Sequence, residues 1–142
     1  MARQRALIAG AAILASAIAV VGMRGWDRPP SQPSSKHAVT LLYVGAQDCA
    51  PCRSWRGGAG AAFRASHEFG RVSYREVESP TVLELLKDEY WPDDLRAYRS
   101  RLDRGAGVPL WLVISDREIV ERAFGESQWA SAVLPKLRLL LQ

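Results

Sequence analysis

The sequence predicts an α/β domain over residues 38–142, with elements in the order β-α-β-α-β-β-α. Short apolar runs typical of strands alternate there with stretches whose apolar side chains recur at helical spacing. The whole chain has 142 residues, of which 48% are hydrophobic and 24% are charged. This composition fits one globular domain and excludes a wholly disordered, collagen-like or coiled-coil chain.

Four segments have the pattern of strands. The first, 38–45 (AVTLLYVG), is a continuous apolar run, as expected of a buried strand. The second, 71–77 (RVSYREV), alternates apolar and polar residues. The third and fourth, 109–115 (PLWLVIS) and 118–124, are separated by a turn at Asp116-Arg117.

A helix is predicted over 51–66, after the first strand. Pro51 falls in its first turn, where no amide donor is missed. Gly57, Gly58 and Gly60 predict a bend or break within it, because glycine weakens a helix. The two cysteines of the chain therefore lie between an apolar strand and this helix.

Three further helices are predicted. Apolar residues at helical spacing place one over 81–90, and a polar helix follows over 92–104. Ser127 is the expected N-cap of the last helix, which should kink at Pro135.

The N-terminal segment predicts export. Arg3 and Arg5 precede an uncharged run, 6–23, that would span about 27 Å as a helix. Residues 1–23 are therefore either a signal peptide that is removed or an anchor that tethers the protein to the inner membrane. The Pro- and Ser-rich segment 24–37 is expected to be a linker. We expect the domain to lie in the periplasm or otherwise outside the cytoplasm.

Most of the net charge of +4 comes from the N-terminal segment. Residues 1–35 carry four arginines and one aspartate, whereas the remainder carries 15 basic and 14 acidic residues. The body of the protein is thus nearly neutral, and nucleic acid is not an expected partner.

The candidate chemistry lies in the sequence CAPC, which contains both cysteines. At a helix N-terminus, free amides and the helix dipole favour a thiolate and lower its pKa. Arg53 and Arg56 add positive potential. Cys49 would attack a partner disulfide, and Cys52 would resolve the mixed disulfide.

Three other interpretations of the cysteine pair stay open: a structural disulfide, half of a metal site, and two core cysteines without a role. A disulfide across so small a loop contributes only about 2 kcal/mol in the chain-entropy model. Two thiolates need further metal ligands, and the only histidines are His37 in the linker and His67 near a predicted helix end. We therefore expect no metal site.

The strand, the CxxC pair and the following helix resemble the start of the thioredoxin-like superfamily. A second similarity is Gly107-Val108-Pro109, followed by strand, turn, strand and Gly125. The resemblance covers about residues 38–142 and implies a four-stranded mixed sheet flanked by helices. It also implies that Pro109 is a cis-proline beside the dithiol and that the backbone of Val108 pairs with a bound peptide.

The sequence departs from that family in several places. Tyr43 stands where thioredoxins have a buried acid, and Asp48 stands where they have a tryptophan. The missing acid argues against an efficient general reductase. The polar helix 92–104 is an extra segment, and its arginines form either a basic edge that faces a partner or a solvated face. These arginines are Arg96, Arg99, Arg101 and Arg104.

We therefore expect a thiol-disulfide oxidoreductase that acts on a protein partner through Cys49 and Cys52, with Val108 and Pro109 as the docking loop. No cofactor is expected, because the dithiol itself carries two electrons. We expect a monomer. The alternative is a non-catalytic thioredoxin-fold module that binds a peptide or a metal. The reduction potential and the electron source of the compartment decide whether such a domain reduces, oxidises or isomerises.

Overall fold

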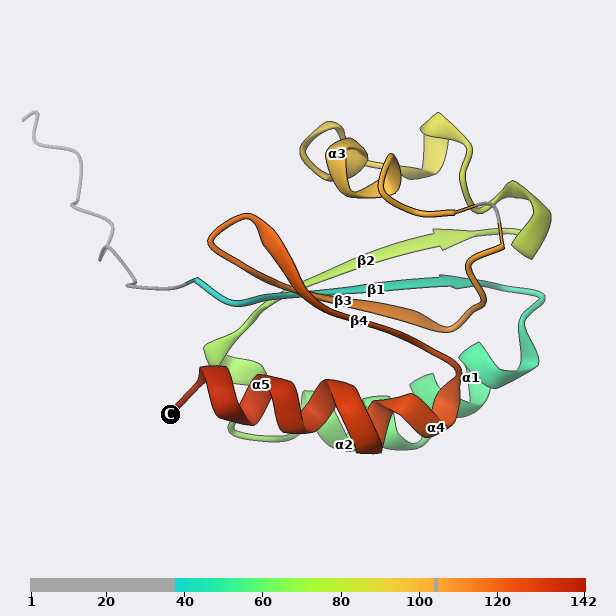
Figure 1. Cartoon of the computed structure of the whole chain (residues 1–142). Coiled ribbons are helices and arrows are strands. Elements are labelled where there is room, and N and C mark those ends of the chain that lie inside the picture. The colour runs from blue at the N-terminus through green and yellow to red at the C-terminus, as the bar shows by residue number, and fades with distance from the viewer. Residues whose placement is uncertain (1–37, 104) are drawn as a thin grey trace, which may run out of the picture. The chain divides into compact units, whose positions relative to one another are not determined.

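The computed structural model describes residues 38–103 and 105–142. Their centre is a four-stranded mixed sheet in the order β2-β1-β3-β4 (Figure 1). The strands are β1 Thr40–Ala46, β2 Ser73–Ser79, β3 Leu110–Ser115 and β4 Glu118–Phe124. β1 runs parallel to β2, whereas β1 and β3, and β3 and β4, are antiparallel. The mixed sheet predicted from the sequence is confirmed.

The expected signal or anchor segment and the linker lie outside the described residues. Arg104 of the expected polar helix lies outside them as well. In the part of the chain that the structure describes, no helix is long and apolar enough to cross a membrane.

The helices α1 Ala50–Gly57 and α2 Ala59–Arg64 follow β1 and lie on one face of the sheet (Figure 1). They are separated at Gly58, so the predicted break among the glycines is confirmed. Gly60 allows a close approach between helix and side chain, because a Cβ atom there would lie 2.9 Å from the ring of Trp55.

The C-terminal helix covers the same face and has three parts. They are α4 Glu126–Gln128, a π-helical turn Trp129–Val133 and α5 Leu134–Leu140. The π-helical turn is wider than an α-helical turn and lies directly before Pro135. Proline has no amide to donate. In a regular α-helix its ring would also collide with the carbonyl group one turn earlier. The predicted irregularity at Pro135 is therefore a π turn. The predicted N-cap is wrong, because Gly125, with a φ of 85°, holds that position and Ser127 lies inside α4.

The segment 80–103 covers the other face of the sheet without the two helices predicted for it (Figure 1). Its elements are η2 Val82–Glu84, η3 Asp88–Tyr90 and η4 Asp93–Leu95, which are 3-10 turns, and the four-residue helix α3 Arg96–Arg99. The predicted helices over 81–90 and 92–104 are therefore wrong in extent. Trp91, the residue between these two predicted helices in the sequence, is buried. Its indole Nε1 donates to the carbonyl oxygen of Leu85 at 2.7 Å. The burial and hydrogen bonding of Trp91 outweigh the preference for a helix that the spacing of the apolar residues indicates.

The arginines of this segment pair with carboxylates of the same chain. Arg96 pairs with Asp93, Arg99 with Asp88 and Arg101 with Glu118. These pairs favour the solvated face over the partner-facing basic edge.

Two apolar clusters fill the space between the sheet and its two covers. On the side of α1, α2 and the C-terminal helix (the helical layer), the cluster includes both cysteines and several buried aromatic rings. These rings are Tyr43, Trp55, Phe63, Trp111 and Trp129. On the side of residues 80–103 (the turn layer), the cluster is aliphatic apart from Trp91. Val108 packs against both clusters, so the chain before β3 joins the two layers.

The central strands are buried on both sides because both covers meet them. Every residue of β3 is buried, and in β1 only Thr40 is partly exposed. The edge strands β2 and β4 mix exposed and buried residues. A continuous apolar sequence is therefore needed only in the two central strands.

Candidate dithiol site

Cys49 and Cys52 lie at the junction of β1 and α1. The Cys49 amide donates to the Ala46 carbonyl oxygen at 3.3 Å and closes a turn at the end of β1. Cys49 is the N-cap residue of α1, and Pro51 lies in the first turn, where its missing amide leaves no helical bond unmade. The two cysteines form a disulfide with their Cα atoms 5.2 Å apart. The pair therefore sits at a helix N-terminus, as the sequence predicts.

The two sulfurs differ in exposure and in hydrogen bonding. Cys52 is fully buried, whereas Cys49 is 6% exposed. Cys49 Sγ accepts a hydrogen bond from the amide of Cys52 at 3.1 Å. Once the disulfide is reduced, this amide and the positive end of the helix dipole both stabilise negative charge on Cys49 Sγ. Both cysteines are buried, and the hydrogen bond from the Cys52 amide distinguishes the sulfur of Cys49.

Two arginines of α1 differ in how their charge is used. Arg53 Nη1 donates to the carbonyl oxygen of Gln47 at 2.7 Å, so its charge lies over the loop before the dithiol. Arg56 pairs with Glu78 at 2.6 Å, and this hydrogen bond is the main cause that raises the Arg56 pKa. The positive potential expected beside the dithiol therefore comes mainly from Arg53, because Glu78 offsets Arg56.

Asp48, the residue before the first cysteine, connects the site to the turn layer. Its carboxylate accepts a hydrogen bond from the amide of Val82 at 3.0 Å. Val82 opens the 3-10 turn η2, so this contact fixes η2 beside the loop that carries the dithiol. The sequence does not reveal the contact, because the two residues are far apart along the chain.

The docking loop predicted at Val108 and Pro109 directly precedes β3, whose first residue, Leu110, pairs with Val44 near the end of β1. It therefore lies at the same end of the sheet as the dithiol. The Val108–Pro109 peptide bond is cis, as the resemblance implies. The Pro109 carbonyl oxygen accepts a hydrogen bond from the Gly125 amide at 2.8 Å. Gly107 lies against Phe124, whose ring would be 2.8 Å from a Cβ atom at that position. Val108 is partly buried and packs against the cluster that contains both cysteines.

Tyr43 occupies the buried position at which thioredoxins are expected to carry an acid. Its ring stacks on Trp55, with centroids 4.7 Å apart and 15° between the planes. Its hydroxyl is buried without a hydrogen-bond partner among the described residues, and burial raises its pKa to about 12. Gly45 makes room for that hydroxyl, because any Cβ atom there would collide with it. Tyr43 is therefore neutral near pH 7 and cannot accept a proton as a carboxylate does.

The carboxylates whose charge raises the pKa of Tyr43 lie on β2 and not on β1. Glu76 and Glu78 lie opposite Tyr43 and Gly45 in the register of the two strands. Burial raises the pKa of Glu76, and the charge of Glu78 adds to that effect. Burial is the largest cause of the raised pKa of Tyr43, and the negative charges of both carboxylates add to it.

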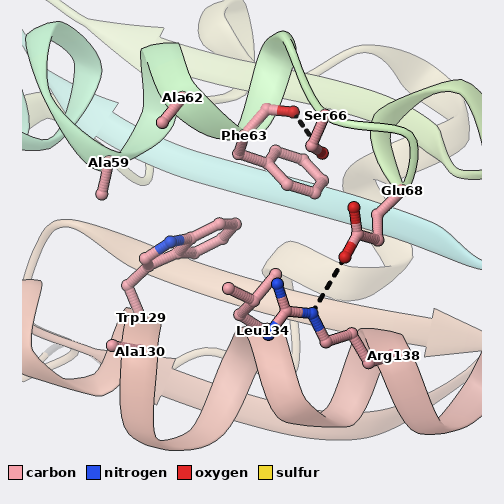
Figure 2. A pocket seen from close by; sticks show the side chains of 9 residues that line it. All are labelled: Ala59, Ala62, Phe63, Ser66, Glu68, Trp129, Ala130, Leu134 and Arg138. Atoms are coloured by element: carbon pink, nitrogen blue, oxygen red, sulfur yellow. Dashed lines mark hydrogen bonds and ion pairs between the residues drawn. The ribbon is translucent and has the colours of Figure 1, made fainter.

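A separate groove lies between α2 and the C-terminal helix (Figure 2). Its volume is about 310 Å³, and Phe63, Trp129 and Leu134 form much of its apolar lining. At one end, Arg138 Nε donates to Glu68 at 2.9 Å, and this bond is the main cause that lowers the Glu68 pKa. The two charged lining residues neutralise each other, and no cysteine lines the groove, so it is not part of the dithiol site.

Metal ligands do not gather in the described residues. No group of three or more His, Cys, Asp or Glu side chains is arranged there to hold a metal ion. Both sulfurs of the CxxC pair are bonded to each other.

Two residues near the site have no sequence signal that reveals them. Leu83 and Phe124 are exposed large apolar side chains on segments that contact the dithiol loop or the cis-proline loop. A single apolar residue at the surface produces no periodic pattern, and only the contacts of the folded chain place it.

The architecture and the site together define the class of protein. A mixed sheet in the order β2-β1-β3-β4, a cysteine pair at the N-terminus of the helix after β1 and a cis-proline directly before β3 make a thioredoxin-like domain. The fold class predicted from the sequence is confirmed.

Solved structures of thioredoxin-fold proteins are similar to this chain. The periplasmic thioredoxin SoxS from Paracoccus pantotrophus, in its reduced form, has a TM-score of 0.49 and 14% identity, over 72% of this chain and 95% of that chain. The germline-specific thioredoxin Deadhead from Drosophila melanogaster has a TM-score of 0.47 and 11% identity, over 70% and 81%. The oxidoreductase DsbH has a TM-score of 0.43 and 18% identity, over 72% and 74%.

Comparisons by sequence give no match. No protein-family model matches the chain, and no curated protein is similar to it in sequence. Since the identities and TM-scores of the solved structures are low, the class rests on the strand order, the dithiol and the cis-proline of this chain.

Proposed function

We propose that the domain exchanges thiols and disulfides with a protein partner through Cys49 and Cys52. The observation that carries the proposal is the position of Cys49 Sγ. It belongs to the less deeply buried residue of the pair, and it accepts a hydrogen bond from the first turn of α1. A sulfur in this position ionises more readily than that of an ordinary cysteine, and the thiolate is the nucleophile of disulfide exchange.

In the reducing direction, the thiolate of Cys49 attacks one sulfur of a partner disulfide. The other partner sulfur leaves as a thiolate and takes up a proton. Cys52 then loses its proton and attacks Cys49 Sγ, which releases the remaining partner sulfur as a thiol and forms the Cys49–Cys52 disulfide. Two electrons pass from the dithiol to the partner, and no cofactor is required. The same steps in reverse oxidise a partner dithiol.

Val108 and Pro109 are the proposed docking loop for the partner segment. Val108 is partly buried beside the cluster that contains the dithiol. The carbonyl oxygen of Pro109 is already engaged by the amide of Gly125. We therefore assign backbone pairing with the partner to Val108 and the shaping of the loop to Pro109.

Replacing each cysteine in turn tests the two roles. Cys49→Ser should abolish the reduction of insulin disulfides, because a serine hydroxyl is not ionised near neutral pH. Cys52→Ser should instead leave a mixed disulfide on Cys49, because the resolving thiol is missing. Insulin precipitation measures the first effect, and mass spectrometry of the trapped adduct measures the second. Full activity of Cys49→Ser would contradict the assignment.

Thiol titration of the reduced protein separates catalysis from the non-catalytic alternative. A catalyst should have one cysteine with a pKa well below the value of about 8.5 for a free cysteine. An unshifted pKa at both positions would favour a module that only binds a peptide or a metal.

We also propose that residues 1–23 export the domain 38–142, or anchor it in the inner membrane, and that 24–37 is a linker. Two arginines followed by a long uncharged run support this proposal. A fusion of residues 1–37 to alkaline phosphatase, which needs the disulfides formed outside the cytoplasm, should be active. The size of the fusion distinguishes a cleaved signal from an anchor, and an inactive fusion would contradict export.

A further inference from the structure

The groove between α2 and the C-terminal helix has the size and lining of a small-molecule site (Figure 2). Its volume of about 310 Å³ lies at the small end of the range for such sites, which are mostly apolar with a few polar groups. No cysteine lines it, so the proposed exchange gives it no role.

Short side chains form the walls of the groove, and aromatic rings lie between them. Ala59 and Ala62 line it from α2, Ala130 lines it from the C-terminal helix, and all three are exposed. The rings of Phe63 and Trp129, which also line it, meet edge to face with centroids 5.0 Å apart and 71° between the planes. Aromatic rings favour further contacts of this kind or offset stacking. The apolar part of the groove is therefore suited to a flat aromatic ring.

Trp129 also brings a hydrogen-bond donor to the groove. The residue is only 4% exposed, and its indole projects from the C-terminal helix toward α2 (Figure 2). Among the described residues, the indole nitrogens that are sealed in the core without a partner are those of Trp55 and Trp111. The nitrogen of Trp129 is not one of them, and no described residue accepts its hydrogen bond. It is therefore open to an acceptor that enters the groove.

The charged end of the groove is electrically neutral. Arg138 Nε donates to Glu68 at 2.9 Å, and the arginine side chain extends into the gap between the two helices (Figure 2). Because the pair has no net charge, a charged ligand would lose hydration there without gaining a free counter-ion. The bond to Glu68 uses only Nε, so the two Nη nitrogens remain donors for a neutral acceptor.

We propose that the groove binds an uncharged aromatic molecule that carries a hydrogen-bond acceptor such as a carbonyl oxygen. Its ring packs on Phe63 and Trp129 between the two alanine-lined walls, which removes apolar surface from water. Its oxygen accepts a hydrogen bond from Trp129 Nε1 or from the guanidinium of Arg138. The proposal does not depend on the proposed exchange, because no cysteine lines the groove.

Three probes with the same naphthalene ring test the proposal on the whole protein. Methyl naphthyl ketone is uncharged, naphthoate is an anion near neutral pH, and naphthylmethylammonium is a cation. The NMR signal of the Trp129 indole N–H, assigned by its loss in Trp129→Phe, reports binding in the groove. This signal should shift and saturate with the ketone. The ketone should bind about fivefold more tightly than either ion, or better.

Ala62→Leu and Ala61→Leu are a matched pair of variants. Both replace an exposed alanine of α2 with another good helix former, and of the two only Ala62 lines the groove. Ala62→Leu should weaken binding of the ketone about tenfold, because leucine occupies the space that the ring needs. Ala61→Leu should bind the ketone as the wild-type protein does. Ala130→Leu narrows the groove from the opposite wall and should repeat the loss.

Glu68→Gln tests the neutrality of the charged end. It leaves Arg138 without its carboxylate, so this end of the groove gains a positive charge. The variant should bind naphthoate about fivefold more tightly than the wild-type protein does, whereas its affinity for the ketone should change less.

Each other outcome overturns the proposal. If none of the three probes gives a saturable shift of the Trp129 signal, the groove does not bind such a molecule. If the wild-type protein binds either ion as tightly as the ketone, the ligand class is wrong. A loss in Ala61→Leu as large as in Ala62→Leu would mean that the effect does not belong to the groove. Unchanged naphthoate binding in Glu68→Gln would refute the part assigned to the ion pair. None of these results bears on the proposed exchange at the dithiol.

Discussion

The helical layer and the turn layer cover the same sheet by different means. In the helical layer, aromatic rings pack beneath the helices: Trp55 stacks on Tyr43 and meets Trp111 and Trp129 edge to face. In the turn layer, short turns are held by a few anchors, of which Trp91 is the largest buried side chain. The first layer carries the sulfurs, and the second carries the exposed Leu83.

The two layers also differ in how their residues are held in place. The cysteines lie in a cluster that includes residues of α1, α2 and the C-terminal helix and of strands β1, β3 and β4, so their geometry is fixed by many neighbours. Leu83 lies on a 3-10 turn whose position depends on single contacts such as that between Asp48 and Val82. Val108 packs against both clusters and connects the two layers at the end of the sheet where they meet.

Trp91→Ala should have the largest effect on the turn layer. The substitution leaves a cavity and removes the hydrogen bond to the Leu85 carbonyl oxygen, so the free energy of unfolding should fall by about 3–5 kcal/mol. Urea unfolding followed by tryptophan fluorescence measures this loss. Because the helical layer keeps its own contacts, the folded variant should still reduce a small disulfide.

Trp91→Phe is the control for that prediction. It keeps an aromatic ring in the core but leaves the Leu85 carbonyl oxygen without its donor, so the loss should be smaller, about 1–3 kcal/mol. If Trp91→Ala costs no more than Trp91→Phe, the indole is not the anchor of the turn layer. Loss of small-disulfide reduction in a folded Trp91→Ala protein would contradict the independence of the two layers.

Sequence reasoning succeeds where local pattern and tertiary structure agree. The continuous apolar runs of β1 and β3 predict strands, with the first of them buried, and both strands are found there. Gly57, Gly58 and Gly60 predict a break, and α1 and α2 separate at Gly58. The cysteine spacing, with the resemblance that it carries, locates the candidate site at the N-terminus of α1 and the cis bond before β3.

The same reasoning fails in the turn layer, where distant contacts decide the structure. Val82, Leu85, Leu86 and Tyr90 have helical spacing, yet the chain forms 3-10 turns there. The indole of Trp91 reaches back to the Leu85 carbonyl oxygen, and the carboxylate of Asp48 holds the Val82 amide. No window of local sequence contains both partners of the second contact. Leu83 escapes prediction for the same reason.

Alkaline pH should act on the helical layer through Tyr43. Burial raises the pKa of this phenol to about 12, whereas the unfolded value is about 10. Below pH 10 the phenol is protonated in both states and its contribution to stability is constant. Between pH 10 and 12 mainly the unfolded state loses the proton, so stability should fall, by about 2 kcal/mol at pH 12. Urea unfolding at pH 8, 10 and 11.5 measures the decline.

Tyr43→Phe isolates that contribution, because Tyr74 and every other titrating group is shared with the wild-type protein. At pH 8 the variant should be at least as stable, since it removes a buried hydroxyl that has no partner among the described residues. Above pH 10 its advantage should grow as the wild-type protein loses stability. Parallel stability curves from pH 8 to 11.5 would mean that the hydroxyl reaches water, and that Tyr43 is not sealed within the aromatic cluster beside the dithiol.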